Sequence, residues 1–388
     1  MAQFNRTDTL PGQDAEGGAA AAPEGPLDNN AKSSRNRSQK WQARGVQWMV
    51  SALPRCRKCG RVTVTNDGRV GVRANGQSVG YAGLSTCGSV WACPVCNSRI
   101  QAVRRLEVGV ALSSLAAMGG GAAFGAITVR HHAGQRLAPL LDALTYGIAR
   151  IARDKAVFTL RERMGYLGRI NALEITLGAN GWHPHRHPLP LFDRPVSPDD
   201  LIELHYAEFR AFRRGVEHRG FEAPSIIANV LMPVDLTTGD TLGEYFAKSE
   251  YSVSGVAFEA ASSSTKKGRK GSRTPWQLLD SVRTTGDADD LDLWNEYEKS
   301  TRGKRALTFS RGLRDRLGLG LEASDEAIAE AEVGDVYDTG FYVTDWSPVA
   351  RNSALGAGLL NAVTPAGHWQ DGRDFCRANG IPIEENDQ

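Results

Sequence analysis

Residues 166–192 read YLGRINALEITLGANGWHPHRHPLPLF, and they predict two adjacent strands. Apolar and polar side chains alternate over residues 166–177 in the manner of a β-strand, and the Ala-Asn-Gly sequence at 179–181 supplies a turn. The histidine-rich residues 181–192 are therefore predicted to form the second strand of a β-hairpin.

The segments around this hairpin alternate between strand-like and helical patterns. We expect strands at 122–130 and 224–234, and helices at 98–118, 137–164, 197–220 and 239–253. From residue 122 the predicted order is β-α-β-β-α-β-α. This order predicts an α+β fold with a ferredoxin-like antiparallel sheet, in which the paired strands are central and the helices lie on one face.

The chain has 388 residues, enough for two domains and tails, and its 41% hydrophobic content is sufficient for an ordinary core. A formal charge of +2 gives no overall indication of a nucleic-acid partner, so such a partner must be inferred from local patches. One local patch is the basic stretch KSSRNRSQKWQARGVQW at 32–48, which carries Trp41 and Trp48. It could contact a phosphate backbone or form a solvated linker, and the sequence leaves both open.

Composition divides the chain into five predicted segments. They are a disordered low-complexity and basic tail (1–40), a module of CxxC motifs with a helix (41–118), a central domain (119–255), a basic linker with a C-terminal block (256–320) and an acidic C-terminal region (321–388). Residues 1–33 have almost no large apolar side chains, so nothing there offsets the entropy lost on ordering. The linker contains four candidate DNA contacts, which are Lys266, Lys267, Arg269 and Lys270.

Residues 108–129 carry no charge, which raises the question of a membrane span. Their apolar content is mostly Ala and Gly, and the glycines at 119–121 interrupt it, whereas a spanning helix needs about 20 strongly apolar residues. We therefore predict a helix end, a turn and a buried strand here. The N-terminus also lacks a charged start followed by an apolar core, so we expect no secretion signal, no membrane partner and a cytoplasmic location.

Five of the six cysteines lie between residues 56 and 96. The segment CRKCG places Cys56 and Cys59 in one CxxC hook, and CPVCN places Cys93 and Cys96 in another. Two such hooks let four thiolates converge on a tetrahedral zinc ion, so the sequence predicts structural zinc. The gap between the hooks can hold a β-hairpin within residues 61–73.

Two disulfides are the rival arrangement for these cysteines, and a reducing cytosol disfavours it. Cys87 is a fifth thiol, which could replace one zinc ligand or be buried. A structural zinc site can contribute on the order of 10 kcal/mol to the folding of its own module. The predicted role of the metal is therefore to stabilise the fold.

Three of the eight histidines, His183, His185 and His187, occupy alternate positions of the predicted strand. Alternate strand residues share a face and lie about 6.6 Å apart along the strand, a span that two imidazoles can bridge to one cation. The outer pair would lie about 13 Å apart, so we expect two ligands from this strand and a third from its neighbour. Glu174 on the preceding strand is the natural oxygen donor, and this donor set suits Mn²⁺ or Mg²⁺ with positions open for phosphate oxygens. The alternative is a surface cluster of histidines without a metal.

The sequence GEYFAKSEY at 243–251 places Tyr245 and Lys248 three residues apart on a predicted helix, and hence on one face. A tyrosine hydroxyl is a weak nucleophile unless a cation or a metal stabilises its phenolate, which Lys248 could do. Beside a metal-binding strand, this pair predicts in-line attack of the Tyr245 phenolate on a phosphodiester. Tyr251 is the fallback nucleophile.

Together these residues resemble the HUH endonuclease superfamily and, within it, the rolling-circle plasmid replication initiators of actinobacterial type. The resemblance covers about residues 50–320 and rests on the order of six blocks along the chain. These blocks are CGSVWACPVCNSRI, AITVRH, GWHPHRHPLPLF, EYFAKSEY, RTPWQLL and WNEYEKSTRGKRALTFSRGLR.

The resemblance implies a site-specific nickase and ligase that cleaves one strand at the double-strand origin of a plasmid. Residues 119–255 would form the HUH core, with His185 and His187 as the metal-binding pair and His183 or Glu174 as a further ligand. Tyr245 would stay joined to the 5′ phosphate and leave a free 3′-hydroxyl as primer. The implied partners are origin DNA, single-stranded or in a hairpin at the nick site, and the host helicase and DNA polymerase.

Two features depart from the pattern of that family. Arg186 stands between the paired histidines, where the family usually has a bulky apolar residue, and Pro188 and Pro190 follow where it has an apolar run. Because proline cannot donate to a sheet ladder, we expect weaker strand pairing or weaker metal binding here.

Two other functions remain open. An HUH transposase or relaxase would use the same chemistry on a different genetic element, although the block at 294–314 favours an initiator. A zinc-dependent DNA-binding regulator without catalysis would account for the cysteines and the basic stretches, but it would leave the histidines and Tyr245 without a role.

Overall fold

The computed structural model describes residues 26–76, 78–234, 236, 272–331 and 338–384, with side chains described from residue 33 onward. The α-helices in these residues are α1 (Pro26–Val50), α2 (Pro54–Lys58), α3 (Pro94–Ala117), α4 (Leu137–Ala152), α5 (Lys155–Arg163), α6 (Pro198–His218), α9 (Pro275–Thr285), α10 (Ala288–Thr301), α11 (Leu313–Arg316), α12 (Asp325–Glu330), α13 (Ser347–Arg351), α14 (Ser353–Val363) and α15 (Trp369–Ala378). A 3₁₀ turn, η1, covers Ile226–Ala228. The strands are β1 (Val70–Ala74), β2 (Val79–Ala82), β3 (Gly121–Thr128), β4 (Tyr166–Gly178), β5 (Gly181–Phe192), β6 (Val230–Val234), β7 (Leu307–Phe309), β8 (Asp338–Val343) and β9 (Ile383–Glu384).

The larger sheet has five strands in the order β6-β3-β5-β4-β7, and each neighbouring pair is antiparallel. Its first four strands, with the helices between them, follow the predicted order along the chain. The predicted α+β class and the antiparallel sheet are therefore confirmed. The helix predicted at 239–253 lies outside the described residues.

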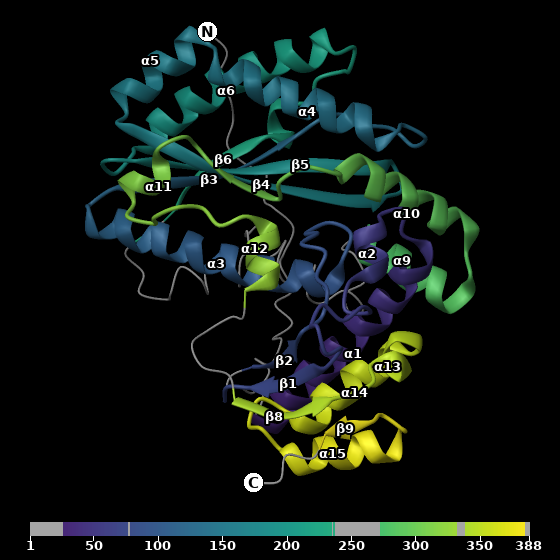
Figure 1. The fold of residues 1–388 in the computed structure, drawn as a ribbon. Coiled ribbons are helices and arrows are strands. Elements are labelled where there is room, and N and C mark those ends of the chain that lie inside the picture. The colour runs from purple at the N-terminus through teal and green to yellow at the C-terminus, as the bar shows by residue number, and fades with distance from the viewer. Residues whose placement is uncertain (1–25, 77, 235, 237–271, 332–337, 385–388) are drawn as a thin grey trace, which may run out of the picture.

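Helices cover both faces of this sheet (Figure 1). α4 and α6 lie on one face, as predicted, and share a core with Leu173 of β4 and Phe192 of β5. α3, which precedes the first strand of the sheet, lies against the opposite face and shares a second core with Leu189 and Leu191. Because successive strand residues point to opposite faces, this half of β5 is apolar on both sides.

β5 contains Pro188 and Pro190 although it is the middle strand of the sheet. Its ladder with β4 continues past both prolines, whereas its pairing with β3 is interrupted between Ala122 and Ile127 of β3. The missing N–H groups therefore fall on the β3 side, and the expected weakening of strand pairing is confirmed there. Gly125 of β3 gives the proline ring room, because a Cβ at this position would lie 3.1 Å from Pro188 Cγ.

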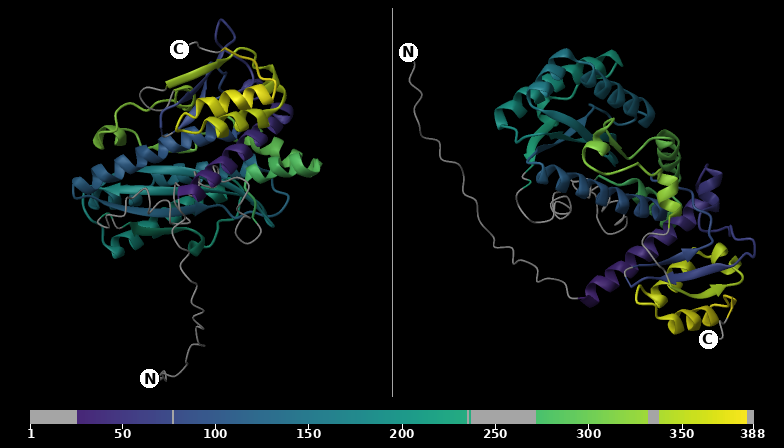
Figure 2. Two further views of the ribbon diagram at one scale, coloured as in Figure 1. Left: turned by 90° about the horizontal axis from the view of Figure 1, so that it is seen from below. Right: turned by 60° about the vertical axis from the view of Figure 1, so that its left-hand side comes forward.

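The smaller sheet joins two distant parts of the chain. Its order is β2-β1-β8-β9, so strands from residues 70–82 pair with strands from residues 338–384 (Figure 2). The hairpin predicted within 61–73 is formed instead by β1 and β2. The cysteine module and the acidic C-terminal region, predicted as separate segments, thus share one sheet and one core, which includes Val72 and Phe341.

Helix α1 begins at Pro26, inside the segment 1–40 that the composition predicts to be disordered. That prediction is wrong for residues 26–40, because contacts with α14 stabilise a helix that its own composition does not favour. Trp41 is buried against Gly356, where an added Cβ would lie 2.4 Å from the ring. In Figure 2 the purple α1 accordingly lies beside the yellow C-terminal helices.

Two further predictions concern helices. The helix predicted at 137–164 divides into α4 and α5, because the Asp154 side chain accepts hydrogen bonds from the N–H groups of Ala156 and Val157 and begins a new helix. The helix end, turn and strand predicted over 108–129 are confirmed by α3 and β3.

In the described part of the chain, no helix combines the length and the apolar character that a bilayer span requires.

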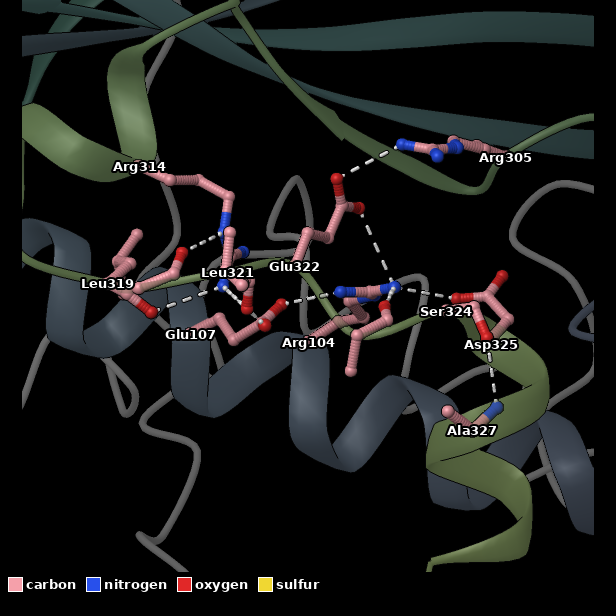
Figure 3. Close-up of polar contacts among 12 residues, drawn as sticks. Arg104, Glu107, Arg305, Arg314, Leu319, Leu321, Glu322, Ser324, Asp325 and Ala327 are labelled. Carbon is pink, nitrogen blue, oxygen red and sulfur yellow. Dashed lines mark hydrogen bonds and ion pairs between the residues drawn. The ribbon is translucent and has the colours of Figure 1, made fainter.

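A network of charges joins the acidic residues after 320 to α3 (Figure 3). Arg104 of α3 is only 6% exposed, and its guanidinium contacts Glu107 Oε2 at 2.9 Å and Asp325 Oδ1 at 2.9 Å. Glu322 lies 3.6 Å from the same guanidinium, and its other oxygen pairs with Arg305 at 3.1 Å. The acidic residues at the start of the C-terminal region are thus bound to the rest of the molecule.

Candidate metal centre

Glu174, His185 and His187 converge on the face of the larger sheet that α3 also covers. The turn at residues 179–180 sets the register of the β4–β5 hairpin and pairs Glu174 with His185 directly across the ladder. The Nε2 atoms of His185 and His187 lie 2.8 and 3.0 Å from the same oxygen, Glu174 Oε2. Two ligands on one octahedral Mg²⁺ would lie about 2.9 Å apart, so this donor set fits a small divalent cation.

Backbone carbonyls fix which ring nitrogen of each histidine faces the centre. His187 Nδ1 lies 3.2 Å from the carbonyl oxygen of Gly125, and His185 Nδ1 lies 3.4 Å from that of His183. A carbonyl only accepts, so each Nδ1–H can donate to its carbonyl, and with a cation in place of the Nε2 proton the Nε2 lone pair would face the centre. The interrupted β3–β5 ladder leaves the Gly125 carbonyl near β5 for this contact.

The centre is largely shielded from solvent. The side chain of His187 is 3% exposed, that of His185 14% and that of Glu174 20%. His187 also stacks on Phe124 of β3, with ring centroids 5.3 Å apart. One side of the centre is therefore packed, and the greater exposure of His185 and Glu174 leaves a route for a ligand.

A second cluster contains the thiols of Cys59, Cys87, Cys93 and Cys96, which are all buried. The sulfur of Cys59 lies 3.8 Å from that of Cys93 and 3.6 Å from that of Cys96, and the Cys87 and Cys96 sulfurs are 3.6 Å apart. Tetrahedral zinc with Zn–S bonds of about 2.3 Å places its sulfurs about 3.8 Å apart. The cluster could therefore hold zinc, and these separations are far too long for disulfides.

The structure brings together three of the four predicted zinc ligands and puts Cys87 in the fourth position. Cys56 is fully buried and lies beside Cys87, but it is outside the group of four. The indole N–H of Trp48 donates to the Cys59 carbonyl at 2.8 Å, and the Trp346 N–H donates to that of Gly60 at 3.1 Å. Both hydrogen bonds fix the backbone at the end of the first CxxC motif, and their donors are not part of the cysteine cluster.

Comparison with curated proteins identifies relatives in Streptomyces. A protein named "Protein rep" from Streptomyces lividans is 30% identical over an alignment of 378 residues, which covers 80% of this chain and 81% of the relative. The chain belongs to this Rep family. A protein named "Neomycin resistance protein" from Streptomyces cyanogenus is 34% identical over 134 residues, which is 28% of this chain and 31% of that protein. No family model and no solved structure matches the chain.

Burial and neighbouring charges set the protonation of the carboxylate in this Rep-family centre. Burial acts to raise the pKa of Glu174, but the imidazoles of His185 and His187 outweigh it and hold that pKa well below its ordinary value. Burial lowers the pKa of His187. A deprotonated carboxylate and a neutral imidazole are the forms that bind a cation.

The structure places His183 outside the Glu174 group, next to His131. The two Nδ1 atoms are 3.5 Å apart, and the His183 ring centroid is 4.9 Å from that of His185. Burial and the neighbouring His185 lower the pKa of His183 to about 3. His131 ends the block AITVRH and was not predicted as a site residue, although it lies just after the strand that pairs with β5.

The other predicted site residues of this Rep-family chain belong to a segment that the structure does not describe. The predicted nucleophile Tyr245, its neighbour Lys248 and the fallback Tyr251 lie outside the described residues. The predicted DNA contacts lie there too, and they are Lys266, Lys267, Arg269 and Lys270.

Proposed function

We propose that this Rep-family chain initiates plasmid rolling-circle replication as an HUH endonuclease that nicks and rejoins origin DNA. The observation that carries the proposal is the pair of imidazole Nε2 atoms that meet one carboxylate oxygen on adjacent strands of the sheet. The order β6-β3-β5-β4 supports it, because with the intervening helices this is the arrangement of a ferredoxin-like core. The name of the Streptomyces lividans relative is consistent with it.

In the proposed mechanism, Glu174, His185 and His187 would hold Mn²⁺ or Mg²⁺. The bound cation would supply Lewis-acid polarisation of a phosphodiester oxygen. His187 keeps its ligand geometry through the Gly125 carbonyl, and Phe124 excludes water from one side of the ring. His183 and His131 border this centre as a neighbouring pair.

The proposed reaction is a transesterification at phosphorus. The Tyr245 phenolate forms a bond to the scissile phosphorus while the bond to the 3′ oxygen breaks, and that oxygen takes up a proton to become a free 3′-hydroxyl. The 5′ phosphate remains on the tyrosine, so rejoining is the reverse attack by a 3′-hydroxyl. Lys248 is proposed to stabilise the phenolate.

The cysteine cluster is proposed to be a structural zinc site that holds Cys59, Cys87, Cys93 and Cys96. Its place between α1, α3 and the smaller sheet suits a role in joining these elements. The host helicase and DNA polymerase are proposed partners at the nicked origin.

A covalent-adduct assay tests the proposal. The protein is incubated with 5′- or 3′-labelled single-stranded origin DNA and Mn²⁺ or Mg²⁺, and products are separated under denaturing conditions. We expect only the fragment downstream of the nick to migrate with the protein, and we expect the adduct to be lost in Tyr245→Phe but kept in Tyr251→Phe. An adduct that persists in Tyr245→Phe would reject the assigned nucleophile, and cleavage without any adduct would reject the mechanism.

A further inference from the structure

A cavity of about 610 Å³ lies between α1, α3, β2 and α14, away from the Glu174 centre. Figure 1 shows these elements together beside the smaller sheet. Among the residues that the structure describes, the charged side chains lining the cavity are cations, namely Arg37, Lys40, Arg44 and Arg99. The residues described around it include hydroxyl side chains, such as Ser98 and Thr86, but no carboxylate.

Three of these cations have only neutral partners in the described part of the chain. Arg37 Nη1 donates to the carbonyl of Leu360 at 3.1 Å, and Lys40 Nζ donates to Ser98 Oγ at 2.7 Å. Arg99 Nη1 donates to the carbonyl of Ala329 at 3.1 Å. Burial, with a further contribution from the charges of Arg37 and Arg105, lowers the pKa of Lys40 to about 8.

Arg44 has a different role, because it faces the cysteine cluster. Burial acts to lower its pKa, but the thiolates of Cys59, Cys93 and Cys96 outweigh this and raise it. Its guanidinium also lies 4.1 Å from the centre of the Trp41 ring. Arg44 therefore offsets the negative charge of the thiolates, whereas Arg37, Lys40 and Arg99 have no anionic partner among the described residues.

Cations that are shielded from water without an anionic partner lose hydration free energy, and an anion that enters the site offsets this loss. Arg and Lys beside hydroxyl donors are the groups that proteins use to bind phosphate oxygens. Arg37 and Lys40 also belong to the basic stretch 32–48, which the nicking chemistry does not use.

We propose that this cavity binds a backbone phosphate of the DNA outside the nick site, through Arg37, Lys40 and Arg99. The inference rests on the proposed function, since it assigns a second contact to the same DNA. Such a contact would position the DNA on the cysteine module while the Glu174 centre acts on the scissile strand. Because a phosphate carries no sequence information, this contact adds affinity for any DNA of the same length.

The test measures DNA binding by fluorescence anisotropy over a range of salt concentrations. Lys40→Gln and Arg99→Gln are compared with wild type and with Arg153→Gln, a control that removes an exposed cation at the end of α4. We expect each cavity variant to weaken binding to origin DNA and to unrelated DNA alike, by about tenfold, and to reduce the slope of log affinity against log salt by about 0.9. The Arg153→Gln variant should match wild type.

Zinc content and thermal melting of each variant show whether it remains folded. If Lys40→Gln and Arg99→Gln keep wild-type affinity and salt slope, the inference is wrong. Loss of zinc with unchanged DNA affinity would assign the cations to the cysteine cluster instead. If the cavity binds ATP or inorganic phosphate, and the cavity variants lose that binding but keep wild-type DNA affinity, the natural ligand is a free phosphate and the inference is wrong. A wild-type protein that forms no covalent adduct, but whose DNA binding depends on Lys40, would reject the proposed nicking while keeping the cavity.

Discussion

At the scale of single residues, the metal centre depends on which face of β5 each side chain occupies. His185 and His187 point to the α3 side, and Arg186 between them points to the α4 side. The departure from the HUH sequence pattern therefore lies on the other face of the sheet. Arg186 has no ion-pair partner among the described residues, and burial together with Arg169 lowers its pKa to about 10.

Arg186→Met should therefore leave the metal centre intact. Replacing a partly buried cation that has no ion-pair partner among the described residues by an apolar side chain of similar length is expected to raise the free energy of unfolding by about 1 kcal/mol. Calorimetric Mn²⁺ titration and chemical denaturation measure the two effects. A marked loss of Mn²⁺ affinity in Arg186→Met would show that Arg186 supports the centre after all.

At the scale of elements, the interrupted contact between β3 and β5 links strand pairing to the metal centre. A Cβ on Gly125 would lie 2.6 Å from the carbonyl oxygen of Val230 and would also crowd Pro188. Since the Gly125 carbonyl accepts the His187 Nδ1–H, any shift of β3 would move a predicted ligand.

Gly125→Ala is expected to lower the free energy of unfolding by about 1–3 kcal/mol and to weaken Mn²⁺ binding. Gly109→Ala in α3 is the matched control, because a Cβ there meets nothing within 4 Å. That change should raise stability by about 0.5–1 kcal/mol. Equal stability of the two variants in denaturant titrations would contradict the close approach described for β3.

The ion pairs of Arg104 attach the acidic residues after 320 to α3, and this attachment can be tested separately. Arg104→Met leaves Glu107, Glu322 and Asp325 without their central partner, so we expect a loss of about 3–5 kcal/mol and faster proteolysis near residue 322. Arg305→Met removes only an exposed cation from Glu322 and should cost less than about 1 kcal/mol. Equal proteolysis of the two variants would show that the network does not hold this segment.

The sequence predicts local features well because neighbouring residues determine them. Alternation over 166–177 and a two-residue turn fix the register that places Glu174 opposite His185. By contrast, β1 pairs with β8 across more than 250 residues, and no local pattern predicts that pairing. The choice of Cys87 over Cys56 also depends on how the loop between the hooks folds back, which CxxC spacing does not determine.

At the scale of the whole molecule, the cysteine cluster lies where α1 and α3 meet the smaller sheet. The proposed zinc ion would therefore stabilise a sheet that contains both early and late parts of the chain. Its contribution should be on the order of 10 kcal/mol to the folding of this part.

Removal of zinc is expected to unfold the smaller sheet before the larger one. Metal analysis should find one zinc per chain, lost in Cys87→Ser but kept in Cys56→Ser. With a chelator, hydrogen exchange should accelerate in β1 and β8 while β4 and β5 stay protected. Wild-type zinc content in Cys87→Ser would contradict the assigned ligand set.

In the proposed mechanism, Glu174, His185 and His187 would hold the divalent cation used for nicking. Mn²⁺ binding, followed by electron paramagnetic resonance on wild type, His187→Ala and Glu174→Gln with Arg153→Gln as control, tests this assignment. We expect one tightly bound Mn²⁺ per chain in wild type and in the control, at least a tenfold loss of affinity in the other two variants, and loss of the covalent DNA adduct in parallel. Unchanged Mn²⁺ affinity in both His187→Ala and Glu174→Gln would contradict the account.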